Sequence, residues 1–190
     1  GRQSSAPRGG RRNAPGPVTP EKIDEGLKTA AMFVGGASLL FSRWANNFRH
    51  HSNRQPMFDP AVSNAAGGDE SIIYYHSHWK LGPEEALVIK VLPPACDTWN
   101  FQLNNYWMES LDYRYFNICL NKASAKYDED GSVRLIVSPT DPGHPNWIDT
   151  CGHTEGTMCW RWYRLKEGIQ PVAPDCQVIQ FKDLKDHEKR

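Results

Sequence analysis

Residues 98–107, TWNFQLNNYW, and residues 157–164, TMCWRWYR, decide the fold class of this chain. Large apolar side chains recur at every second position of both stretches. This alternation is typical of a strand with two different faces, because successive side chains of a strand point to opposite sides of its sheet. One face of each stretch is therefore predicted to pack in a core. The apolar face of the first stretch comprises Trp99, Phe101, Leu103 and Trp107, and its other face carries the amides Asn100, Gln102 and Asn104.

The chain around these two stretches indicates a β-sandwich. Aromatic residues make up 11% of the 190 residues, and 15 Gly and 14 Pro supply turns, which favours a turn-rich β protein of one domain. Segments rich in β-branched or aromatic residues lie at 71–79, 86–92, 98–107, 113–120, 133–139, 157–164 and 176–181. Because no helical segments separate them, we expect an antiparallel sandwich or jelly roll of seven to eight strands.

A helix is predicted over residues 20–48, ahead of the strands. Thr19 can cap its N-terminus, and Pro20 suits the first helical position. Apolar residues lie on nearly all its sides, so the helix either packs on the sandwich or forms a contact with another subunit. Its longest apolar run, residues 30–41, reaches about 18 Å at about 1.5 Å per residue, too short to cross a bilayer core of about 30 Å.

Composition divides the chain into four predicted parts: a tail at 1–18, the helix and a long loop at 19–70, the sandwich at 71–184 and a charged end at 185–190. The first tail carries four arginines and no acid, which is typical of a solvated leader or linker, the remnant of a transit peptide, or a segment that contacts a partner. The whole chain has 22 basic and 22 acidic residues, so we expect no binding to nucleic acid through bulk charge.

The five cysteines form no C-x-x-C pair, and no signal-peptide pattern precedes them. They predict free thiols in a reducing compartment, either the cytoplasm or an organelle interior. Cys151 and Cys159 flank His153 but lack the second ligand pair of a structural zinc site. His76 and His78 share one face of a strand, as metal ligands of cupin-like jelly rolls do, yet the remaining ligands do not match. We therefore expect no metal and no cofactor.

The second candidate for chemistry is the segment 141–161. Asp149, His153 and Arg161 could converge there as a carboxylate, an imidazole and a guanidinium, which permits acid–base catalysis, binding of a ligand, or a structural clamp. The residues predicted to line a polar ligand pocket are Gln102, Asn104, Asn146, Asp149, His153 and Arg161. The other interpretation of the amide row, Asn100, Gln102 and Asn104, is that it lies on a solvated outer face of the sandwich.

Longer motifs point to a family. They are EEALVIKVLPP (84–94), ESLDYRYFN (109–117), YDEDGSVRLIVS (127–138) and DPGHPNWIDTCGHTEGTMCWRW (141–162). In order and density they resemble the domain-of-unknown-function family 1214, over about residues 72–184. The resemblance implies a mostly β, jelly-roll-like domain, and it brings no catalytic assignment. The positions that match the family's signature are Asp141, Pro142, Gly143, Asn146, Trp147, Asp149, Gly152, His153, Gly156, Arg161 and Trp162.

Two main functional hypotheses follow, and they predict different partners. The first is a non-catalytic accessory or binding subunit that meets a protein partner or a second copy through its tail and the helix at 20–48. The alternative is an enzyme acting on a sugar or a carboxylate through Asp149, His153 and Arg161. A cupin-like metal site at His76 and His78 is the third hypothesis.

Overall fold

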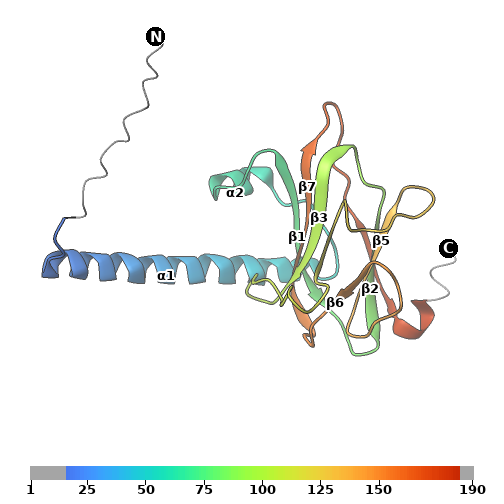
Figure 1. The fold of residues 1–190 in the computed structure, drawn as a ribbon, viewed down its shortest axis with the longest axis horizontal. Coiled ribbons are helices and arrows are strands. Elements are labelled where there is room, and N and C mark those ends of the chain that lie inside the picture. Colours follow the sequence, from blue (N-terminus) through green and yellow to red (C-terminus); the bar gives the residue numbers. More distant parts are fainter. Residues whose placement is uncertain (1–15, 185–190) are drawn as a thin grey trace, which may run out of the picture. The chain divides into compact units, whose positions relative to one another are not determined.

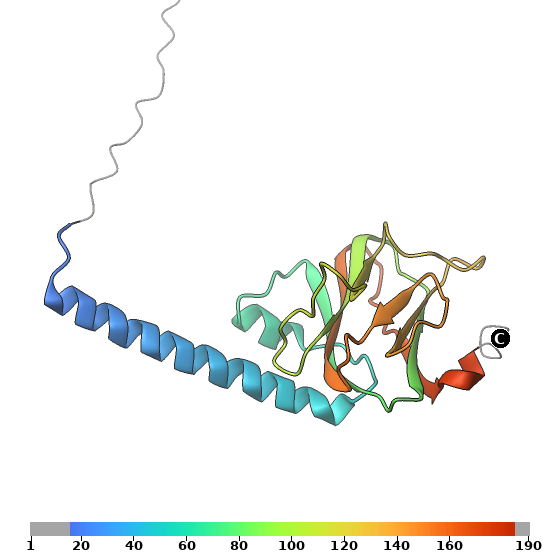
Figure 2. The same ribbon diagram turned by 60° about the horizontal axis from the view of Figure 1, so that its bottom comes forward.

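Eight strands form two sheets in the computed structural model, which describes residues 16–184. The first sheet has the order β1 (Ile72–Lys80), β7 (Glu155–Leu165), β3 (Cys96–Asn104) and β4 (Cys119–Asn121). The second has the order β6 (Trp147–Asp149), β5 (Val133–Ser138), β2 (Glu85–Val91) and β8 (Asp175–Gln180). Figures 1 and 2 show the two sheets facing each other. The predicted β-sandwich is confirmed, with one departure: β5 and β6 pair in parallel.

Most of the basic N-terminal tail and the whole of the segment 185–190 lie outside the described residues. Within residues 16–184, no helix combines the length and the apolar character that a membrane crossing needs.

The faces predicted for the strand at 98–107 are confirmed up to residue 104. Trp99, Phe101 and Leu103 are fully buried between the sheets. Trp99 stacks on Trp160 at 4.7 Å between ring centroids, and Trp162 packs edge-on against Trp99 at 6.3 Å. The expectation that Trp107 belongs to this core is wrong, because β3 ends at residue 104 and the indole lies on the surface.

The strand predicted at 113–120 is also largely wrong. Residues 113–115 form a turn, residues 116–118 form no strand, and only β4 remains at the end of the segment. The cause lies at Asp112, whose carboxylate accepts a hydrogen bond from the backbone N–H of Arg114 at 3.1 Å. Its carbonyl accepts a second one, from the N–H of Phe116 at 3.1 Å. An aspartate that bonds the backbone two residues later favours a turn over a strand.

The predicted helix is confirmed as α1 (Pro20–Phe48), followed by the 3₁₀ turn η1 (Arg49–His51) and the short helix α2 (Pro60–Ala65). The chain divides into two compact units at residues 39 and 40, so the final turns of α1 belong to the same unit as the sandwich. Ala45 and Phe48 are buried there. Trp44 and Phe48 both pack edge-on against Phe58, each at 6.0 Å. The packing predicted for the helix is thus seen for its last turns.

The segment 52–58 runs along β1, the terminal strand of the first sheet. The N–H of Asn53 donates to the carbonyl of His78 at 2.8 Å, and its side chain exchanges two hydrogen bonds with the backbone of Lys80. Further along, the N–H of Phe58 donates to the carbonyl of Tyr74 at 2.7 Å. The carbonyls of Tyr74 and His78 and both backbone groups of Lys80 are therefore satisfied by this segment.

Candidate functional site

The outer face of the first sheet carries the amide row and Arg161. The register places Arg161 between Tyr74 of β1 and Asn100 of β3. Its guanidinium donates to the Asn100 side-chain oxygen at 3.3 Å and lies 5.9 Å from the centre of the Tyr74 ring. On the same face Gln102 donates to the side-chain oxygen of Asn104 at 2.7 Å. Three of the six predicted pocket residues, Gln102, Asn104 and Arg161, therefore share this face.

His76 lies on the same face in an aromatic surrounding. Its ring stacks on Phe48 at 5.3 Å and on Tyr74 at 5.6 Å, and Phe58 meets it edge-on. Burial, helped by the charge of Arg161, lowers the pKa of His76 to about 4. Its Nε2 lies 3.8 Å from the Sγ of Cys159, and burial raises the pKa of that thiol to about 11. Both groups are neutral at pH 7, so this pair provides neither an acid nor a thiolate nucleophile.

His78 has different neighbours. Its Nδ1 lies 2.8 Å from the hydroxyl of Ser52, and its Nε2 lies 3.6 Å from the Glu155 carboxylate. Burial lowers the pKa of His78, although the charge of Glu155 opposes this shift. The same carboxylate also contacts Arg49 at 3.5 Å and Lys80 at 3.9 Å. Across residues 16–184, no three His, Cys, Asp or Glu side chains are grouped so that they could hold a metal ion.

Asp149 and His153 lie away from Arg161, at the end of β6 and in the turn that follows it. The Asp149 carboxylate accepts from the backbone N–H of Cys151 at 2.8 Å, and the N–H of His153 donates to the carbonyl of Thr150 at 2.9 Å. No hydrogen bond or ion pair within residues 16–184 joins Asp149, His153 and Arg161 to one another. Burial raises the pKa of Cys151 to about 11, which leaves this thiol protonated.

Asn146 is buried, and its side chain makes three hydrogen bonds to backbone groups. Its oxygen accepts from the N–H of Lys126 at 2.8 Å, and its nitrogen donates to the carbonyls of Lys126 and Arg134 at 2.7 and 2.8 Å. The side chain thus fastens two distant segments to the loop before β6. Both N–H donors of the amide are therefore engaged within the fold, and its oxygen already accepts one hydrogen bond.

Asn146→Ala is expected to lower the free energy of unfolding by about 2–3 kcal/mol, because one buried and two part-buried hydrogen bonds to the backbone are lost. Chemical denaturation measures this change. Asn64→Ala, at an exposed position of α2, is the matched control and should change stability by less than about 0.5 kcal/mol. Equal small effects in both variants would show that the Asn146 bonds add nothing to stability.

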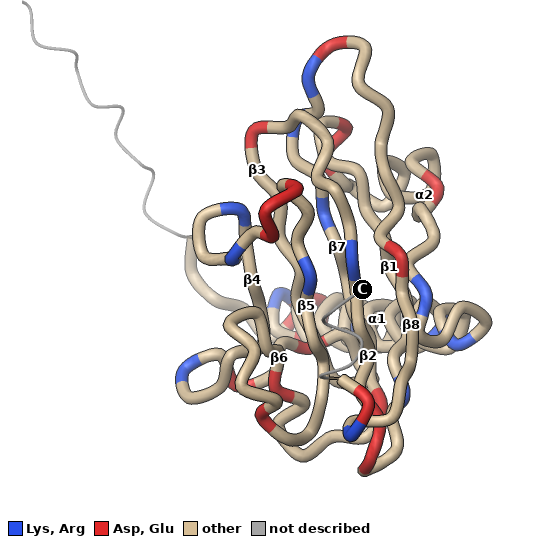
Figure 3. The backbone as a smooth tube through the Cα atoms, turned by 90° about the vertical axis from the view of Figure 1, so that its right-hand side faces the viewer, with Lys and Arg blue, Asp and Glu red and all other residues tan. Residues whose placement is uncertain are grey.

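A pocket that the sequence reasoning missed lies over the loop before β6. Its volume is about 320 Å³, and its lining comprises Asn117, Asp141, Gly143, His144, Pro145 and Trp147. The Asp141 carboxylate accepts from the N–H of Gly143 at 2.7 Å, and the Trp147 indole donates to the carbonyl of Ser138 at 3.1 Å. These residues lie in or near the run DPGHPNW (141–147), which we used for the family resemblance, without a ligand role for any residue of this lining. Most strand positions of the sandwich carry no charge (Figure 3).

Fold and site together define a β-sandwich domain that follows an N-terminal helix and in which the predicted set of Asp149, His153 and Arg161 is not assembled. No family model matches the chain, and no curated protein matches it. Among solved structures it is similar to an uncharacterised protein from Burkholderia cenocepacia, with 50% identity and a TM-score of 0.85 over 90% of this chain and 47% of that one. The chain thus spans about half the length of that protein. A protein from Vibrio parahaemolyticus matches 58% of this chain and 31% of its own, with 16% identity and a TM-score of 0.48.

Proposed function

We propose that the chain is a non-catalytic accessory domain that binds another protein domain through α1. The observation that carries this proposal is the exposure of large apolar side chains on the helix. Phe33, Met32 and Leu27 are 74%, 69% and 66% exposed. Further members of the set are Ile23, Val34, Leu39 and Leu40. Contiguous apolar surface of this kind marks an interaction site in a protein that folds in water.

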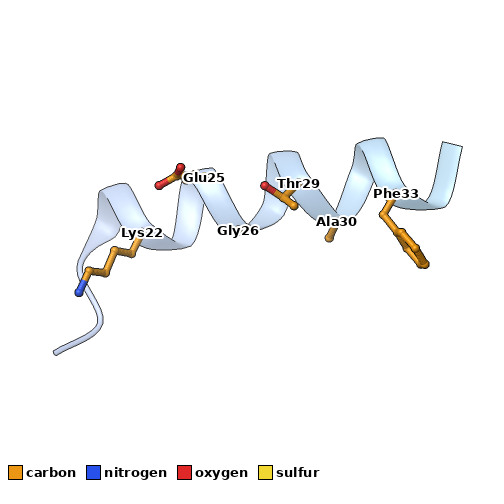
Figure 4. Close-up of a pocket in the computed structure, with 6 residues that line it drawn as sticks. All are labelled: Lys22, Glu25, Gly26, Thr29, Ala30 and Phe33. Carbon is orange, nitrogen blue, oxygen red and sulfur yellow. The ribbon is translucent and has the colours of Figure 1, made fainter. Parts of the chain in front are cut away.

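One side of the helix also has a shape suited to contact. A groove of about 580 Å³ lies along its first turns, lined by Lys22, Glu25, Gly26, Thr29, Ala30 and Phe33 (Figure 4). Gly26 and Ala30 form its floor, because neither has a long side chain. Phe33 stands at one end of the groove and Lys22 at the other. A ridge of side chains on a second helix or loop could pack into such a groove.

The partner that we propose is a different protein domain rather than a second copy. About half of the Burkholderia protein lies outside the part that this chain matches. That protein therefore has enough additional chain for another domain beside a helix and sandwich of this kind. Burying one side chain such as Phe33 or Leu27 contributes about 1.5–3 kcal/mol, so burial of most of this apolar set is needed to offset the entropy lost on association.

The sandwich itself presents a second apolar set, on the loop between β3 and β4. Trp107, Tyr113, Tyr115 and Phe116 are exposed there. Aromatic side chains are enriched at protein interfaces. This loop supports an interaction role more than it supports catalysis, as does the separation of Asp149 and His153 from Arg161.

The test mixes the full chain with the unmatched part of the Burkholderia protein and follows complex formation by native mass spectrometry. We expect a one-to-one complex, and the double variant Leu27→Glu/Phe33→Glu should weaken it at least about 30-fold, because two charges would enter a desolvated contact. Asn46→Glu adds a charge at an exposed polar position of α1 and should leave the complex intact. A homodimer of the chain, or no complex at all, would contradict the proposal.

A further inference from the structure

A second pocket, of about 380 Å³, lies between the segment 51–56 and the start of β8. The segment is fastened along β1, the terminal strand of one sheet, while β8 is the terminal strand of the other. Arg54, Gln55 and Asp175 supply its polar lining, together with His51. All of these residues belong to the unit that contains the sandwich. None of them was singled out by the sequence.

Gln55 is the unusual member of this lining. Its side chain is only 3% exposed, yet neither its amide nitrogen nor its amide oxygen has a hydrogen-bond partner. The groups beside it are engaged elsewhere: the carbonyl of His51 accepts from Ser77 and Arg54, and the thiol of Cys176 lies 3.8 Å from the carbonyl of Pro174. A buried amide without partners destabilises the fold. Packing alone does not explain an amide at residue 55, since an apolar side chain of similar size would fill the same space without this cost.

Two opposite charges line the same pocket. Arg54 comes from the segment after α1, and Asp175 comes from the first residue of β8. Both residues are exposed, and no ion pair joins them. The space between them is thus bordered by a guanidinium, a carboxylate and an amide that can both donate and accept. The Arg54 side chain is exposed and lines the same pocket as Gln55, so a ligand in the pocket can meet both residues.

We propose that this pocket binds a small zwitterion, a molecule that carries one carboxylate and one ammonium group, as an α-amino acid does. The carboxylate lies against Arg54, where a guanidinium can hold it with two hydrogen bonds. The ammonium lies against Asp175. Gln55 then donates from its nitrogen to the carboxylate and accepts at its oxygen from the ammonium, so that the buried amide is satisfied only when the ligand is present.

The first test follows the thermal unfolding of the full chain in the presence of each neutral proteinogenic amino acid in turn. We expect at least one of them to raise Tm, since a ligand that binds only the folded state stabilises it. Propionate and ethylammonium each carry one half of the alanine zwitterion and should raise Tm much less. The proposal would be overturned if no amino acid raised Tm, or if propionate or ethylammonium raised Tm as much as the amino acid does.

The second test uses Gln55→Met, which keeps the volume and removes the amide. Without ligand we expect Tm to rise by about 2–4 °C, because an unsatisfied buried group is removed, and the shift caused by the amino acid should be lost. Gln180→Met makes the same change at an exposed position of β8 and should alter neither quantity. Arg54→Met and Asp175→Asn lie on the surface and should also abolish the ligand shift. A lower Tm for Gln55→Met, or a ligand shift that survives it, would refute this assignment.

Discussion

Gly156→Ala is expected to lower the free energy of unfolding by about 3–5 kcal/mol, the largest effect we expect from a single methyl group in this protein. Gly156 lies in β7 opposite Trp79 of β1. The Trp79 indole crosses it to donate to the carbonyl of Asn104 on β3, at 3.1 Å. A Cβ at residue 156 would overlap that carbonyl oxygen and lie 2.7 Å from the indole nitrogen. The substitution therefore both overpacks the sheet and breaks a buried hydrogen bond.

The measurement is urea unfolding followed by tryptophan fluorescence, with Gly36→Ala as the control. Gly36 lies in α1, and a Cβ there would meet nothing within 4 Å. Because alanine forms helix more readily than glycine, this control should stabilise the helix by up to about 1 kcal/mol. If Gly156→Ala unfolded at the wild-type urea concentration, the close approach of the Trp79 side chain to residue 156 would be refuted.

The protein is expected to lose stability as the pH falls from about 6.5 to about 4, and His76 is expected to account for up to about 3 kcal/mol of this loss. The unfolded chain protonates its histidines near pH 6.5, whereas burial holds the pKa of His76 at about 4 in the folded protein. Between these values the unfolded state binds more protons, so acid favours unfolding. Below about pH 4 both states are protonated at this residue, and its contribution no longer changes.

His76→Phe tests this directly. A phenyl ring can keep the stacking on Phe48 and Tyr74, and it does not titrate. Free energies of unfolding measured from pH 7 to pH 4 should fall less steeply in the variant than in the wild type. Burial also lowers the pKa of His78, so part of the pH dependence should remain. Parallel curves for the two proteins would show that His76 titrates alike in the folded and unfolded states.

Much of the fold could be predicted from local patterns. The alternation in residues 98–104 and 157–164 identified two central strands, because period-two patterning needs only neighbouring residues. The turn at Asp112 and the parallel pairing of β5 with the three-residue β6 could not be predicted with equal ease. The first depends on a side chain that competes with the sheet for backbone hydrogen bonds. The second depends on which distant segments meet.

The candidate site was harder to predict for the same reason. Their closeness in the sequence led us to predict that Asp149, His153 and Arg161 could converge. However, Asp149 lies in β6 and Arg161 in β7, and these strands belong to different sheets. The partners of Asn146 lie 20 and 12 residues away, and nothing in the local sequence reveals them. The burial of Gln55 depends on how the segment after α1 lies against the rest of the domain. Such contacts are set by tertiary structure, so residue type alone gave no signal for them.

The segment that lies along β1 has a consequence for how this domain avoids self-association. A terminal strand with free backbone groups is a template for strands of other molecules, and natural proteins shield such edges. Here the shield is the connection from α1, through Asn53 and Phe58. A chain that began at the first strand would expose the rim of its sheet to its own copies. The segment 52–58 therefore links the helix to the sandwich and also protects the edge of β1 from aggregation.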